Sequence, residues 1–120
     1  YTRGDNAPEC NLAGFHSQSG RGCGTDYTFP ADSLPDGASP YGVLHMAGNV
    51  IEWTSSIHAA CETDPTSEAD RARIEGETLR YVAGGSFTDD ASVLVVNKRN
   101  LAEQETKSVS MGIRCAKDLR

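Results

Sequence analysis

The first forty residues show no regular alternation of hydrophobic and polar positions. Gly, Ser, Asp, Asn and Pro recur every few positions, and isolated apolar side chains stand among them at Phe15, Tyr27, Phe29 and Leu34. Pro30, Pro35 and Pro40 exclude a continuous helix in their region, because proline removes a backbone donor and clashes with the preceding turn. We therefore predict ordered loops for residues 1–40.

The hydrophobic residues concentrate from position 41 onward. Residues 41–54 form the most apolar stretch, and Gly42 and Gly48 interrupt it, which predicts a short helical turn followed by a strand ending at residues 53–55. Three further strands are predicted at residues 80–83, 92–96 and 111–116, and one or two helical turns at residues 67–73. The run at 92–96 is apolar on both faces, so we expect it at the centre of the sheet.

Composition limits the classes of function. The chain has 120 residues and a net charge of −6, and its Lys and Arg residues do not cluster. Phosphate binding needs clustered basic residues, so we expect no nucleic-acid partner. No apolar run approaches the ~18 residues that would span a bilayer, so we expect no membrane span. The length fits one domain, residues 1–120, and the opening at Tyr1 without a signal pattern is interpreted as a fragment or a processed piece.

The four cysteines predict disulfides in preference to a metal site. They form no C-x-x-C pair, and no histidine lies at helical spacing to another ligand, which disfavours zinc. Cys10 and Cys23 close a short loop rich in Gly and Ser, leaving Cys61 and Cys115 as a less certain second pair. Buried free thiols are the alternative. Disulfides would place the protein in an extracellular or periplasmic compartment.

Three sequence blocks resemble the sulfatase-modifying factor family, which includes the formylglycine-generating enzyme. Residues 41–54 are similar to the family pattern Y/F-G-L-x-D-M-x-G-N-V-W-E-W-T, residues 82–87 to V-x-R-G-G-S-W/Y, and residues 112–116 to G-F-R-C-A. A weaker fourth match covers residues 3–5 and 8–11. The resemblance implies an α+β fold, a C-type-lectin-like variant that is loop-rich with a small twisted antiparallel sheet. It also implies that residues 1–120 are the C-terminal part of such a domain, without its N-terminal half.

Most of the matched residues have properties typical of a scaffold. Gly48 and Gly85 suit positions where the chain turns tightly or approaches another backbone closely. Trp53, the single tryptophan, is predicted to anchor the core. The amide of Asn49 is able to hold loop carbonyls and amides together.

Glu52 is a carboxylate inside an apolar block, and burying it without a partner would be costly. The resemblance implies calcium as that partner, held by Glu52 and by the backbone carbonyls of Ala47, Gly48 and Val50. Oxygen ligands of this kind suit a hard cation. The alternative is a salt bridge to Arg99 or Arg114. The family's second calcium loop would match Asn11 and Leu12, but its acidic ligand falls near residues 23–26, which makes that site doubtful.

The resemblance also bears on catalysis. The formylglycine-generating enzyme carries two cysteines, five residues apart, that bind copper and activate oxygen. Aligning the Gly-Gly-Ser sequence puts Asp89 and Leu94 at those positions. Neither side chain replaces a thiolate, so we expect no copper and no oxidase activity of this kind.

Two main functions and one structural role remain open. The first is a non-catalytic module that binds a protein or small-molecule ligand, for which we predict a pocket lined by Phe87, Thr88, Asp89, Asp90, Lys98 and Arg99. The same residues are also consistent with a solvated strand end and an ordinary ion pair. The second is a fragment of a formylglycine-generating-type oxidoreductase whose reactive residues lie on a missing segment. The third is a subunit held by contacts with an N-terminal half or a partner subunit.

Overall fold

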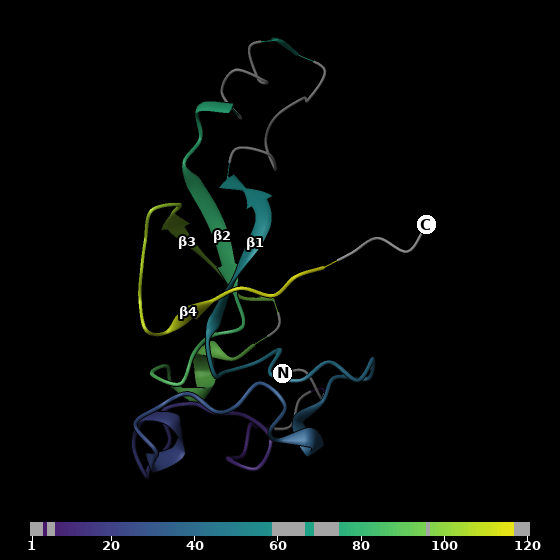
Figure 1. Ribbon diagram of the computed structural model, residues 1–120, viewed down its shortest axis with the longest axis vertical. Helices are drawn as coiled ribbons and strands as arrows, with labels where there is room; N and C mark the ends of the chain where they lie inside the picture. Colours follow the sequence, from purple (N-terminus) through teal and green to yellow (C-terminus); the bar gives the residue numbers. More distant parts are fainter. Residues whose placement is uncertain (1–3, 5–6, 59–66, 69–74, 96, 117–120) are drawn as a thin grey trace.

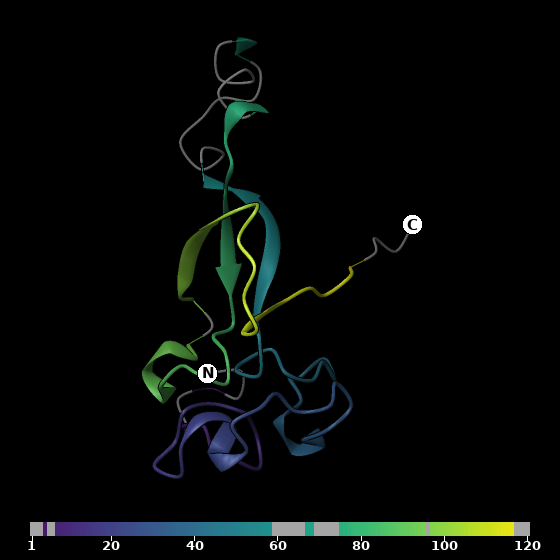
Figure 2. The same cartoon turned by 60° about the vertical axis from the view of Figure 1, so that its left-hand side comes forward.

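The structure, a computed structural model, describes residue 4 and residues 7–58, 67–68, 75–95 and 97–116. In both views, the loops before residue 50 gather at one end of the molecule and the strands extend away from them (Figures 1 and 2). The elements are η1 (Arg21–Gly24), η2 (Pro35–Gly37), β1 (Ile51–Ile57), β2 (Leu79–Ala83), η4 (Ala91–Val93), β3 (Arg99–Glu103) and β4 (Met111–Gly112). Loops with short 3-10 turns therefore fill residues 7–40, as predicted.

The four strands form one sheet in the order β3-β2-β1-β4. β2 lies antiparallel to both β1 and β3, whereas β1 and β4 pair in parallel, with Ile51 opposite Met111 and Glu52 opposite Gly112. The sheet is therefore mixed, and the prediction of an antiparallel sheet was wrong for β4. The parallel pairing brings β4 next to the start of β1.

β1 begins at Ile51, directly after the Gly-Asn turn. The helical turn predicted before it does not form, because the backbone there has repeated left-handed residues: Gly42 at φ 78°, His45 at 53°, Gly48 at 77° and Asn49 at 64°. A right-handed helix cannot contain these angles. The segment is a series of bends that changes direction before entering the sheet.

The prediction of a central strand at residues 92–96 was also wrong. Its first residues belong to η4, and the strand that pairs with β2 is β3, at Arg99–Glu103. Within the described part of that run, Leu94 is buried, Val93 and Val95 are partly buried and Ser92 is exposed, whereas β3 is an edge strand with mostly exposed side chains. Residues 69–73 of the predicted helical turns lie outside the described residues.

The buried core lies among the loops. Ala13, Phe15, Ala47 and Leu94 pack together, and Leu94 is only 1% exposed. Trp53, the predicted core anchor, is half-buried on β1 opposite Val82. No helix long and apolar enough to cross a membrane occurs in the part of the chain that the structure describes.

Candidate functional site

The Gly-Asn turn joins three distant loops by backbone and side-chain hydrogen bonds. Gly48 donates its N–H to the carbonyl of Gly84 at 2.8 Å, and Asn49 donates its N–H to the carbonyl of Gly14 at 2.7 Å. The Asn49 side chain accepts from the Phe29 N–H at 2.8 Å and donates to the Phe29 carbonyl at 3.1 Å. The predicted role of this amide is confirmed. Asn49 is 7% exposed, so the hydrogen bonds between its amide and the Phe29 backbone lie inside the protein.

The segment after the Gly-Gly-Ser sequence is bonded to this frame. Phe87 donates its N–H to the Asn49 carbonyl and accepts from the Gly22 N–H, both at 2.8 Å. Its side chain is 6% exposed. Asp89 accepts from the backbone N–H and the hydroxyl of Ser86, at 2.9 and 2.7 Å. The segment therefore holds loops together.

The first three residues of the predicted pocket have internal partners. Phe87 is buried, the Thr88 hydroxyl lies 2.9 Å from the Ser86 hydroxyl, and the Asp89 carboxylate bonds Ser86. Leu94, at the second position that the resemblance assigns to a cysteine, lies in the core. These side chains are occupied in maintaining the fold.

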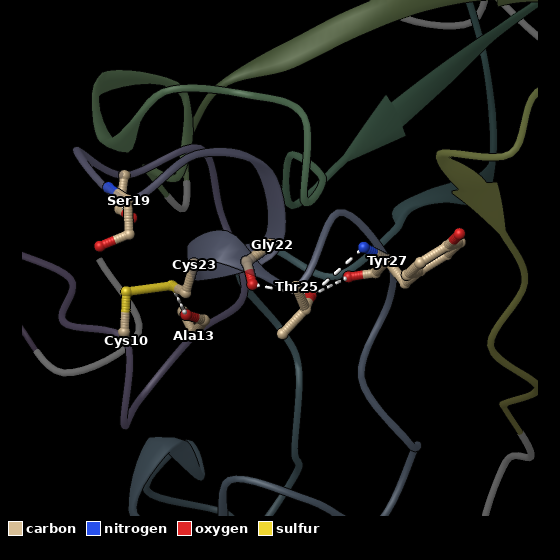
Figure 3. The surroundings of a disulfide bond; sticks show 8 residues. Cys10, Ala13, Ser19, Gly22, Cys23, Thr25 and Tyr27 are labelled. Atoms are coloured by element: carbon tan, nitrogen blue, oxygen red, sulfur yellow. Dashed lines mark hydrogen bonds between the residues drawn. A yellow bond between two sulfur atoms is a disulfide. The ribbon is translucent and has the colours of Figure 1, made fainter.

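The predicted disulfide between Cys10 and Cys23 is present, with the two Cα atoms 5.7 Å apart. Figure 3 shows it beside the turn in which Thr25 donates its hydroxyl to the Gly22 carbonyl, at 2.9 Å. Cys115 carries a free, exposed thiol, and Cys61 lies outside the described residues, so the second pairing has no support. The disulfide agrees with an oxidising compartment.

A groove lies between residues 15–18 and residues 90–92. It encloses about 470 Å³ and is lined by Phe15, His16, Ser17, Gln18, Asp90, Ala91 and Ser92. His16 and Asp90 pair as neighbours in a parallel bridge, and their side chains approach to 3.5 Å between Nδ1 and Oδ1. Of the predicted pocket residues, Asp90 is the one that lines this groove.

The remaining predicted residues of that pocket, Lys98 and Arg99, are exposed at the start of β3. The Lys98 N–H bonds the Val95 carbonyl, at 3.1 Å. Neither residue lines the groove at Asp90.

Glu52 is paired with Arg114. The Arg114 guanidinium donates from Nε to Oε2 at 2.9 Å and from Nη2 to Oε1 at 2.6 Å, and Nη2 also bonds the Leu44 carbonyl at 2.8 Å. The Glu52 side chain is 18% exposed. The salt bridge to Arg114, which the sequence left as an alternative, is thus formed, and it supplies a cation to this carboxylate.

The same pair bounds a second cavity of about 150 Å³, lined by Ala31, His45, Asn49, Val50, Glu52, Ile113 and Arg114. Of the other predicted calcium ligands, Ala47 lies in the core and Gly48 in the turn beside it. Among the described residues, no group of three or more His, Cys, Asp and Glu side chains could hold a metal. A calcium ion at Glu52 would have to share the carboxylate with the guanidinium or displace it, and the site stays a prediction.

The side of the groove formed by residues 15–18, which includes His16, was not predicted from the sequence. Residues 15–18 lie in an unpatterned loop, and long-range backbone bonds bring that loop to Asp90, among them the bond from the His16 N–H to the Asp89 carbonyl at 2.8 Å. The partial signal was a polar run, His16 to Gln18, directly after an apolar anchor.

Comparisons with known proteins agree with the motifs. The chain matches the family model of the sulfatase-modifying factor enzyme 1-like domain over residues 1–119. No curated protein matches it. Among solved structures, it is similar to Treponema denticola variable protein 1, with a TM-score of 0.53 and 22% identity over 86% of this chain. The match covers 34% of that protein, so the chain spans about a third of its length. The chain belongs to the sulfatase-modifying factor enzyme 1-like domain family.

Proposed function

We propose that this chain is a non-catalytic ligand- or protein-binding module of the sulfatase-modifying factor family, with the lectin-like variant of its fold. The observation that carries the proposal is that Asp89 and Leu94, at the two positions where the resemblance calls for reactive cysteines, both have structural roles. Asp89 is hydrogen-bonded to Ser86, and Leu94 is 1% exposed in the core.

The chemistry of these two side chains supports the proposal. Copper(I) prefers soft sulfur ligands, and leucine has no donor atom at all. The Asp89 carboxylate is a hard ligand whose Oδ2 already accepts two hydrogen bonds from Ser86. A thiolate available for thiol–disulfide exchange is also missing from both positions.

A binding role is supported by the way the loops are held. A disulfide, the Asn49 amide and the Gly-Asn turn fix the loops without long helices. Recognition sites are often found on loops positioned by such a rigid frame. The groove at Asp90 is the ligand site that we propose.

Copper(I) affinity tests the proposal. Protein with its free thiols alkylated is titrated against a chromophoric copper(I) chelator, with ascorbate keeping the metal reduced. We expect no transfer of copper to the wild type, and the same result for Asp89→Ala. Stoichiometric transfer that Asp89→Ala removes would overturn the non-catalytic assignment.

The second candidate function is part of an oxidoreductase whose reactive residues lie on another segment. Under that proposal, residues 1–120 would form the C-terminal part of a larger domain and would pack against an N-terminal half or a partner subunit. The full gene sequence tests it. Paired cysteines or clustered histidines upstream would favour the enzyme, and their absence the binding module.

A further inference from the structure

The groove between residues 15–18 and residues 90–92 carries a charge pattern that indicates a class of ligand. Both walls are fixed by the backbone: the His16 N–H bonds the Asp89 carbonyl at 2.8 Å, and the Val93 N–H bonds the Asp90 carbonyl at 2.9 Å. The wall with His16 also lies inside the loop that the disulfide between Cys10 and Cys23 closes. The groove is therefore formed before any ligand arrives, which lowers the entropic cost of binding.

Asp90 is the negative charge of the groove. Its side chain is 76% exposed, and it makes no capping hydrogen bond to η4. The ionic partner that the described residues give it is His16, at 3.5 Å, which is charged only when protonated. Among the described lining residues there is no lysine or arginine. A cation from outside can therefore approach this carboxylate without displacing a permanent positive charge.

The other lining residues provide apolar contacts and hydrogen-bond partners. Phe15 and Ala91 are apolar, and the hydroxyls of Ser17 and Ser92 can accept hydrogen bonds. An ammonium group has three donors and no acceptor, and a methylene stem packs well on apolar surface. The net charge of −6 attracts cations towards the protein and repels anions.

From these observations we infer that the groove binds an aliphatic ammonium, with the charged end on Asp90 and the stem against Phe15 and Ala91. The ammonium could belong to a lysine side chain in a peptide or to a free alkylamine. The inference rests on the proposed binding function and gives it a ligand class.

The test is a titration of ¹⁵N-labelled full chain followed by amide NMR spectra. The probes are acetyl-Gly-Lys-Gly-amide, the same peptide acetylated at Nζ, and n-butylammonium. We expect saturable shifts at residues 16–18 and 90–92 with the lysine peptide, and about tenfold weaker binding after acetylation removes the charge. Because the pair is exposed, binding should also weaken as salt is added. Tighter binding of butylammonium than of the peptide would identify free amines as the ligand, tighter binding of the peptide would identify a lysine side chain, and equal binding would support the ammonium group and its stem as the part that is recognised.

Asp90→Asn should weaken binding about threefold to tenfold, since it removes the charge and keeps the shape. Asp32→Asn, an equal change of net charge at an exposed residue outside the groove, should leave the affinity unchanged. The spectra themselves show whether each variant is folded. Absence of shifts in the groove, equal binding of the acetylated peptide, or equal effects of the two variants would each overturn the inference. None of these outcomes depends on copper or on turnover, so failure here is distinguishable from failure of the proposed function.

Discussion

Replacing Leu94 with alanine should destabilise the protein strongly, because the leucine fills the centre of the loop core. The side chain is 1% exposed and packs with Ala13, Phe15 and Ala47. Burial of this kind gives losses of about 2–5 kcal/mol for a change to alanine, depending on how far the site collapses.

The surroundings of Leu94 argue against collapse. Its methyl groups lie 3.2 Å from the positions that a Cβ would take at Gly48 and at Gly85, so two of its neighbours are backbone. Both glycines have left-handed backbone angles, φ 77° and 68°, and Gly48 is hydrogen-bonded to Gly84. Backbone held in this way cannot move in to fill a cavity. We therefore expect a loss of about 3 kcal/mol, within the range for buried leucines. At the usual unfolding entropy per residue, this corresponds to a fall of about 12 °C in Tm.

Urea and thermal unfolding followed by circular dichroism measure this loss. Leu101→Ala is the matched control, because it removes the same atoms from a side chain that is 42% exposed on β3. It should cost less than about 1 kcal/mol. If Leu94→Ala cost no more than the control, the assignment of residue 94 to the core would be refuted.

Three further changes test the frame. Asn49→Ala should cost about 2–3 kcal/mol in urea unfolding, because it removes two buried hydrogen bonds and a residue that tolerates the left-handed angle; a loss below about 0.5 kcal/mol would contradict that role. Cys10→Ser should lower stability by about 3 kcal/mol, the entropy of a loop with a separation of 13 residues, and reductant should then have little further effect on Tm. If Glu52 binds calcium, millimolar calcium should raise Tm relative to chelator and Glu52→Gln should abolish the difference. Identical melts would leave Arg114 as the cation for this carboxylate.

The features predicted correctly from the sequence are those set by local chemistry. Glycines ended β2 where expected, the apolar block after the Gly-Asn turn entered the sheet as β1, and the amide of Asn49 bonded a loop backbone. The spacing of Cys10 and Cys23 across a Gly-rich loop was sufficient to identify their bond. Each of these signals comes from the chemistry of the residue itself or of the short loop that contains it.

The errors arose where tertiary contacts override local pattern. The run at residues 92–96 has the composition of a central strand, but a short apolar run gives no periodicity that separates a strand from another buried segment. β3 went unpredicted because its exposed residues pair with β2 and need no apolar face. The groove depends on His16 meeting Asp90, which follows from a backbone bridge between distant loops and from nothing in either loop alone.

The central claim is that this chain does not generate formylglycine, and turnover of a peptide tests it most directly. The chain is incubated with a peptide carrying the sulfatase cysteine motif, copper and a reductant, with an active formylglycine-generating enzyme as positive control, and the peptide is examined by mass spectrometry. Because the family resemblance puts Asp89 and Leu94 at the two thiol positions, we predict that the peptide cysteine remains unchanged. Conversion of that cysteine to the aldehyde by the wild-type chain would contradict both the alignment of these residues and the binding-module assignment.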